Sequence, residues 1–149
     1  PFTSFLILRG LKTLEIRMQK HCANAKAVAE FLDAHPAVEK VYYPGLKNHE
    51  RYEVATRQMK DFGGMISFEV KGGRAAGVKL LNSLHLVTVA VSLGDAETLI
   101  EHPASMTHST YTEEELAASG IAAGLIRLSV GLENAEDLIA DLKQALDTL

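Results

Sequence analysis

Arg127 lies within an aliphatic stretch, Leu125 to Glu133 with the sequence LIRLSVGLE, and carries the most informative chemical group of the chain. Because side chains alternate along a strand, Ile126 and Leu128 would share one face while Arg127 points to the other. A planar guanidinium can bind a carboxylate through two parallel hydrogen bonds, so Arg127 is a candidate for holding the carboxylate of an amino acid. The pattern is also typical of a strand arginine that simply faces water.

The densest polar segment runs from Val91 to Thr112 and contains a second candidate, Ser92. Ser92 ends a predicted strand directly before Leu93 and Gly94, where a flexible backbone could approach a ligand closely. Serine and threonine in such a segment are also typical of ordinary turns and caps. Ser92 is therefore a candidate for ligand binding, with a turn serine as the alternative.

Several other kinds of site are not expected. His102 and His108 are six positions apart, which does not match the short ligand spacings of structural zinc sites, so no metal site is predicted. The two Gly-Gly pairs match neither a dinucleotide-binding motif nor a P-loop, and no G-x-S-x-G sequence indicates a hydrolase serine. His21 and Cys22 are neighbours on a helix and face different directions, so a catalytic Cys-His pair is not expected.

The spacing of apolar residues predicts one long amphipathic helix from about residue 4 to residue 33, ending before Pro36, with a possible kink at Gly10. Its first third, Phe2 to Leu11, is apolar nearly all round. A helix of that kind needs burial on several sides, so we expect this part to pack against something outside the chain.

Strands are predicted at 38–43, 65–70, 86–91 and 125–130, with helices at about 49–60 and 74–83 and a final helix capped by Asn134. This order predicts an α/β (α+β) fold with a sheet of about four strands and helices packed on one face. The other face would stay open, with Arg127 projecting from it.

The chain has 149 residues, enough for one domain with a hydrophobic core. Its net charge of -4 indicates no basic surface for nucleic acid, so we do not expect nucleic-acid binding. No apolar run is long enough to span a membrane or is arranged like a signal peptide, so we do not expect a membrane partner either. A single cysteine, Cys22, excludes an internal disulfide and fits a reducing, cytoplasmic location. The chain begins at Pro1 and runs directly into a helical pattern, so we expect a piece of a longer protein.

Five segments carry a resemblance to a known family: FLILRGLKTLEIRMQKHCANA, YYPGL, FGGMISFEVKGG, AVSLGDAETLIEHPASMTHS and GLIRLSVGLE. Together they resemble the carboxy-terminal domain of the Cys/Met-metabolism family of pyridoxal-phosphate (PLP) enzymes. The resemblance implies a fold-type-I enzyme, usually a homotetramer, in which a large N-terminal domain binds PLP and this small domain closes over an amino acid substrate. We therefore expect a long linking helix over residues 1–33 and an α/β sandwich over residues 36–149.

The same resemblance implies roles for four residues. The arginine of the family's R-L-S-V-G motif falls on Arg127 and binds the substrate α-carboxylate. The serine of its S-L-G motif falls on Ser92, implied to be catalytic and close to both the cofactor and that carboxylate, and Leu93 lies at the edge of the site. Val91 precedes Ser92 at a position that is often acidic in relatives that handle cystathionine, which indicates a smaller, apolar thioether such as methionine.

The lysine that carries the Schiff base in this family has no counterpart here, because none of the nine lysines, including Lys12, lies in the S-x-T-K context. The cofactor-stacking tyrosine and the aspartate that pairs with the pyridine nitrogen are also missing, so PLP should be bound by a large domain outside this chain. We expect the full-length protein to eliminate the γ-substituent of methionine or a related sulfur amino acid, with cystathionine or O-acetylhomoserine chemistry as alternatives. The segment alone should be inactive.

Two hypotheses of another class stay open. A free-standing module could bind small carboxylates without catalysis, and it would have no exposed apolar patch around Phe2 to Leu8. A purely structural dimerisation domain predicts instead that Arg127 is paired with an internal acid.

Overall fold

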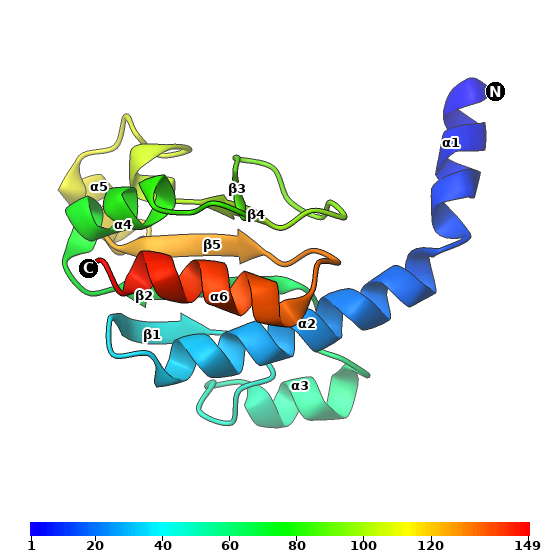
Figure 1. Cartoon of the computed structure of the whole chain (residues 1–149), viewed down its shortest axis with the longest axis horizontal. Helices are drawn as coiled ribbons and strands as arrows, with labels where there is room; N and C mark the ends of the chain where they lie inside the picture. The colour runs from blue at the N-terminus through cyan, green and yellow to red at the C-terminus, as the bar shows by residue number, and fades with distance from the viewer.

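The computed structural model describes all residues from Pro1 to Leu149. The helices are α1 (Phe2–Leu11), α2 (Leu14–Ala34), α3 (Tyr52–Gln58), α4 (Gly73–Asn82), the 3-10 helix η1 (Pro103–Ser105), α5 (Glu113–Ala118) and α6 (Ala135–Leu146). The strands are β1 (Val38–Tyr42), β2 (Met65–Val70), β3 (Thr88–Val89), β4 (Leu99–Glu101) and β5 (Leu125–Ser129). Helices α2 and α6 lie side by side against the sheet, and α1 projects away from it (Figure 1).

The five strands form one mixed sheet in the order β1-β2-β5-β4-β3. All neighbours are antiparallel except β3 and β4, which are parallel. Strand β5 is central, and its register places Arg127 opposite Ser67 of β2 on one side and Glu101 of β4 on the other. Directly opposed residues share a face, so the middle of the sheet carries a transverse row of three polar residues.

The alternate residues of the strands turn toward the helices and form one hydrophobic core. Phe68 on β2 and Ile126 and Leu128 on β5 have no exposed surface. Helices contribute a matching set of fully buried residues: Ala25, Val28, Ala29, Leu32, Leu80, Leu138, Leu142 and Ala145. The predicted arrangement of helices on one face of the sheet is confirmed, as is the core side of β5.

The sheet has five strands, one more than the sequence predicts. The additional strand, β4, lies inside the polar segment from Val91 to Thr112, where no strand is predicted, and all three of its residues are buried, so no alternation reveals it. Strand β3 is shorter than the predicted strand 86–91. The backbone N–H groups of Leu86 and Val87 bond to the Asp141 carboxylate at 2.9 Å, so the ladder begins only after them.

The helix predicted from about residue 4 to residue 33 is two helices, α1 and α2, separated by a break at Lys12 and Thr13, just after the kink predicted at Gly10. In a continuous helix the Gly10 carbonyl would bond to the backbone four residues later. Here it accepts a hydrogen bond from the Arg17 guanidinium at 2.8 Å, which also donates to the Thr13 hydroxyl at 3.3 Å. Helix α2 ends at Ala34, before Pro36 as predicted.

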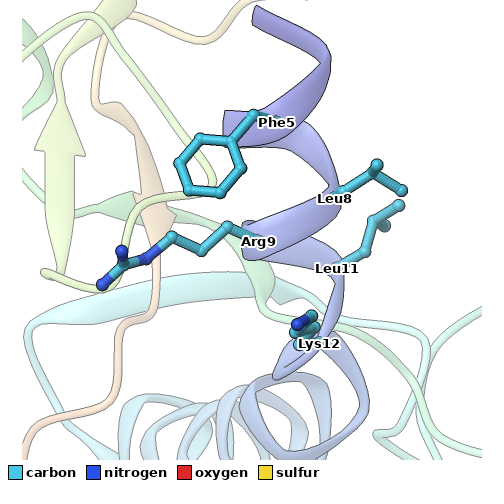
Figure 2. A pocket seen from close by; sticks show the side chains of 5 residues that line it. All are labelled: Phe5, Leu8, Arg9, Leu11 and Lys12. Carbon is cyan, nitrogen blue, oxygen red and sulfur yellow. The ribbon is translucent and has the colours of Figure 1, made fainter. Parts of the chain in front are cut away.

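Helix α1 contains no buried residue and extends away from the rest of the molecule (Figure 1). Phe5 and Arg9 point to one side of the helix while Leu8 and Leu11 point to the other, so apolar groups surround it (Figure 2). Six large apolar side chains on α1 are 49–71% exposed: Phe2, Phe5, Leu6, Ile7, Leu8 and Leu11. A contiguous apolar surface of this kind marks an interaction site. No helix of the chain combines the length and the apolar character needed to cross a bilayer.

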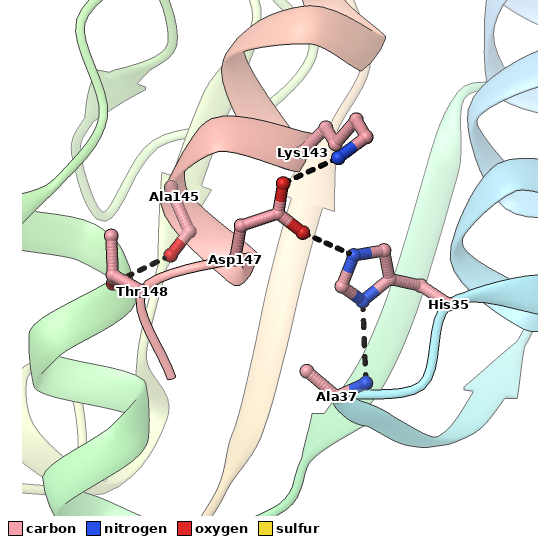
Figure 3. A network of polar contacts seen from close by, with 6 residues as sticks. All are labelled: His35, Ala37, Lys143, Ala145, Asp147 and Thr148. Atoms are coloured by element: carbon pink, nitrogen blue, oxygen red, sulfur yellow. Dashed lines mark hydrogen bonds and ion pairs between the residues drawn. The ribbon is translucent and has the colours of Figure 1, made fainter.

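The final helix begins as predicted, because the Asn134 side chain accepts a hydrogen bond from the Glu136 N–H at 2.8 Å. Its other end is tied to α2 through His35, whose Nε2 lies 3.3 Å from the Asp147 carboxylate (Figure 3). Lys143 binds the second oxygen of Asp147. The Lys143 hydrogen bond, followed by that of His35, lowers the pKa of the exposed Asp147.

Candidate functional site

Arg127 projects from β5 on the face of the sheet opposite the core, and its side chain is 26% exposed. Its Nη1 atom lies 2.8 Å from Oε1 of Glu101. Its Nη2 atom donates to the backbone carbonyl oxygens of Val91 at 3.0 Å and Ser92 at 3.2 Å. A guanidinium has five N–H donors, so these contacts fix its orientation and leave the Nε–H and one Nη1–H for a ligand.

The structure brings Arg127 together with the segment of Val91, Ser92 and Leu93, the other residues with predicted roles. The contact to Ser92 is made by its backbone carbonyl, while its hydroxyl is exposed and hydrogen-bonds to no other residue. The side chains of Val91 and Leu93 are 58% and 55% exposed. Val91 and Ser92 thus contact the guanidinium through their backbone, Leu93 follows them in the same exposed segment, and the roles of the three residues stay predictions.

The segment after Ser92 is held to the strand that carries Arg127. The Gly94 N–H donates to the Ser129 hydroxyl at 2.8 Å, and Ser129 shares the open face of β5 with Arg127. Gly94 has a φ of 78°, a left-handed conformation that side chains with a Cβ rarely adopt. The flexible backbone predicted here is therefore a specific turn that returns the chain to β5.

A second set of polar contacts fixes the segment between Gly94 and β4. The Thr98 hydroxyl donates to the Glu133 carboxylate at 2.7 Å and accepts from the Gly131 N–H at 2.8 Å. The Asn24 amide donates to the carbonyl oxygens of Gly131 at 3.0 Å and Glu133 at 2.8 Å. These hydrogen bonds connect helix α2 to the turn after β5, and that turn to the segment before β4, beside the site.

Glu101 is the functional candidate that the sequence reasoning missed. Its side chain is only 2% exposed, and its register position on β4 is directly opposite Arg127. One carboxylate oxygen binds Arg127, whereas the other, Oε2, is buried without a hydrogen-bond partner. The signal that could have found Glu101 is its place at the end of a short apolar run, Leu99 and Ile100, but only the sheet register pairs it with Arg127.

His102 follows Glu101 and points into the opposite side of the sheet, where it has no exposed surface. Its Nε2 lies 2.8 Å from the Ala123 carbonyl oxygen and its Nδ1 lies 2.8 Å from the Ser105 hydroxyl. With Nε2–H as donor, the neutral ring satisfies both partners. Burial lowers the pKa of His102, and the nearby Arg74 lowers it further, against the opposing effect of the Ala123 carbonyl.

A pocket of about 210 Å³ lies next to Leu93 and Gly94, between the start of α2, the start of β2 and the end of β5. Arg127 and Ser92 do not line it. Its walls are formed by Leu14, Arg17, Met18, His21, Gly64, Met65, Leu93, Gly94, Ser129 and Val130. The pocket therefore adjoins the site through Leu93 and Gly94 rather than containing it.

The contacts of the Arg127 guanidinium are all with oxygen atoms. The contacts of Arg127 are with one acid and two backbone carbonyls, and no lysine is among them. Elsewhere in the chain, no group of three histidine, cysteine, aspartate or glutamate side chains could hold a metal ion.

Comparison with known proteins identifies similar sequences and structures. A profile of the family described as Cys/Met metabolism PLP-dependent enzyme matches residues 1–147. L-methionine gamma-lyase of Treponema denticola is 68% identical over 149 residues, which cover 100% of this chain and 37% of that protein. L-methionine gamma-lyase of Porphyromonas gingivalis is 66% identical, with the same coverage of 100% and 37%. The chain thus spans little more than a third of the length of these relatives.

A solved structure has nearly the same fold. The cystathionine gamma synthase of Xanthomonas oryzae pv. oryzae, in complex with aminoacrylate and cysteine, superposes with a TM-score of 0.90 at 52% identity. The match covers 99% of this chain and 38% of that chain. The fold is therefore shared with this cystathionine gamma synthase.

Proposed function

Because the chain belongs to the Cys/Met metabolism family of PLP-dependent enzymes, we propose that it is the carboxy-terminal, substrate-carboxylate-binding domain of a carbon-sulfur lyase. The proposed reaction of the full-length protein is γ-elimination from methionine or a related sulfur amino acid. Relatives named L-methionine gamma-lyase are 56–68% identical to this chain, whereas the cystathionine gamma synthase is 52% identical. This difference favours a methionine lyase over the synthase as the assignment.

The observation that carries this proposal is the oriented guanidinium of Arg127 on the open face of the sheet. The carbonyl groups of Val91 and Ser92 are neutral acceptors, whereas a substrate carboxylate adds a negative charge and can accept two parallel hydrogen bonds from the guanidinium. A carboxylate can therefore take the place of these carbonyls on Nη2, next to the free Nε–H. In this proposal Arg127 fixes the α-carboxylate.

The exposed residues on the rim have different proposed parts. The Ser92 hydroxyl, which no other residue engages, is available to hydrogen-bond the substrate beside Arg127. Leu93 excludes water at the edge of the site, and its side chain also lines the neighbouring pocket. Val91 offers an apolar surface, 58% exposed, to the thioether end of the substrate. An apolar residue at this position suits methionine better than the charged distal end of cystathionine.

PLP, when bound, supplies an electron sink for the carbanion chemistry of γ-elimination. None of the lysines of this chain lies in the S-x-T-K context, so we propose that the cofactor is bound by an N-terminal domain outside this chain. The exposed apolar helix α1 supports such a partner, because a free-standing module would have no such surface. We further propose a homotetramer as the assembled form and the cytoplasm as its location, which a single buried thiol suits.

A second candidate function, a structural dimerisation domain, is favoured by one observation. That hypothesis predicts an internal acid paired with Arg127, and Glu101 is such an acid at 2.8 Å. The pair leaves part of the guanidinium exposed, with its Nε–H and one Nη1–H unpaired. Carboxylate binding therefore explains the exposed part of Arg127 better.

The test is to replace Arg127 in the full-length protein. Arg127→Leu should raise KM for L-methionine about 10- to 100-fold, since it removes charged hydrogen bonds to the carboxylate. Arg127→Lys keeps the positive charge but not the planar guanidinium, so its KM should lie between that of the wild type and that of Arg127→Leu. Arg57→Leu, on the exposed end of α3, is the matched control. A KM for Arg127→Leu equal to that of the wild type would refute the proposal.

A further inference from the structure

We infer that Glu101 is a positioning residue that aims the Arg127 guanidinium at the ligand and sets how strongly it holds a carboxylate. This inference rests on the proposed function of Arg127. It concerns a residue that touches the binding group rather than the substrate.

The geometry makes Glu101 the fixed partner of Arg127. The two residues are directly opposed on the neighbouring strands β4 and β5, and strands hold their side chains more rigidly than loops do. Glu101 is 2% exposed, whereas Arg127 is 26% exposed, so the acid is shielded from solvent while part of the guanidinium is open to it. A ligand that arrives from the open face meets Arg127 first.

The other partners of Arg127 are exchangeable. Val91 and Ser92 contribute neutral carbonyls to Nη2, and both residues are exposed in a segment outside the strands. An incoming carboxylate can displace these weaker acceptors, while the buried Glu101 stays on Nη1. The carboxylate then binds to an arginine whose charge is already balanced. Glu101 thus weakens the attraction for the anion as it fixes the direction of the donors.

The unpartnered oxygen of Glu101 argues against a purely stabilising role. A buried ion pair offsets its desolvation only when the remaining lone pairs are also hydrogen-bonded. Here Oε2 is buried and has no partner, so this pair leaves part of its desolvation cost uncompensated. The same feature provides a clean experiment. Replacing Oε2 with an amide nitrogen in Glu101→Gln breaks no hydrogen bond of Oε2 and keeps an acceptor for Arg127.

The experiment measures KM for L-methionine and the inhibition constant of propionate, a bare carboxylate, in the full-length holoenzyme. Glu101→Gln removes the opposing charge but not the acceptor, so propionate should bind about three- to tenfold more tightly. Glu101→Leu removes the acceptor as well, so the guanidinium loses its direction and KM should rise about tenfold or more. The changes should fall on KM and the inhibition constant more than on kcat. Glu39→Gln, an exposed strand acid on β1, is the matched control.

The outcomes separate this inference from the proposed function. If Arg127→Leu alters KM and propionate binding but Glu101→Gln leaves the inhibition constant at the wild-type value, Glu101 is not a tuning residue. If Arg127→Leu alters neither quantity, the proposed function itself fails. Thermal unfolding of each variant checks folding, and Glu101→Gln carries the test if Glu101→Leu does not fold.

Discussion

The Asp141 carboxylate of α6 accepts a hydrogen bond from the Val87 backbone N–H at 2.9 Å, linking the final helix to the strand that leads to Ser92. The N–H groups of His85 and Leu86 donate to the same carboxylate, each at 2.9 Å. Burial acts to raise the pKa of Asp141, but the three backbone donors and Gln144 together outweigh it and lower the pKa. The segment before the site is therefore anchored by one ionised side chain.

Asp141→Asn should destabilise the chain by about 2–3 kcal/mol, because an amide offers one acceptor oxygen in place of a charged carboxylate that binds three backbone donors and Gln144. Urea unfolding at neutral pH measures the loss. Asp137→Asn, on the exposed part of the first turn of α6, should cost only about 0.3–1 kcal/mol through the helix dipole. Equal losses in the two variants would mean that Asp141 does not anchor the segment.

The sequence predicted the open face and its arginine because strand alternation is a local property. The spacing of Ile126, Arg127 and Leu128 alone determines which side chain leaves the core. Glu101 could not be predicted in the same way, since its meaning depends on strand β4. That strand has only three residues, all buried, and the partner that orders it lies more than twenty positions further along the chain. The local spacing of apolar residues does not predict which distant segments pair as strands.

The exact position of the helix break, at Lys12 and Thr13, was missed for a related reason. The apolar spacing continues through it, and the sequence places the flexible residue Gly10 slightly earlier. The break is accompanied by a side chain one turn later, Arg17, which bonds to the Gly10 carbonyl in place of the helix backbone. Side-chain competition for backbone groups of this kind depends on geometry that a hydrophobic pattern does not contain.

The buried His102 should make stability dependent on pH in the weakly acidic range. Its pKa in the folded chain is below its ordinary value of 6.5, so between these two values the unfolded chain binds more protons. Its contribution to stability is therefore complete above about pH 6.5 and decreases as the pH falls toward the lowered pKa. NMR titration of the ring should show a midpoint below 6.5.

Urea unfolding between pH 5 and 7.5 provides the second measurement for His102. His102→Gln cannot titrate, so its stability should change less over this range than that of the wild type. Identical pH dependence in the two proteins, together with an ordinary ring titration, would contradict a buried neutral histidine.

Gly77 of α4 should not tolerate alanine, although alanine is normally the better helix residue. A Cβ at Gly77 would lie 2.7 Å from Cδ2 and Nε2 of the His102 ring, which Ala123 and Ser105 hold in place. We expect Gly77→Ala to lose about 1–3 kcal/mol through this clash, offset in part by helix propensity. The control is Gly10→Ala in α1, where nothing lies within 4 Å of the added carbon. A Gly77→Ala midpoint in urea at or above that of the wild type would show that the ring moves freely.

The isolated chain should not form a stable complex with PLP. The residues around Arg127 include no lysine that could form a Schiff base with PLP, so no covalent attachment of the cofactor is available there. After incubation with PLP and gel filtration, the visible absorbance band of a bound cofactor should be absent from the chain and present in the full-length protein. Labelling of surface lysines would give a weak, non-stoichiometric band that persists in Arg127→Leu. A stoichiometric band in the isolated chain that is lost in Arg127→Leu would place the cofactor here and overturn the division of roles between the two domains.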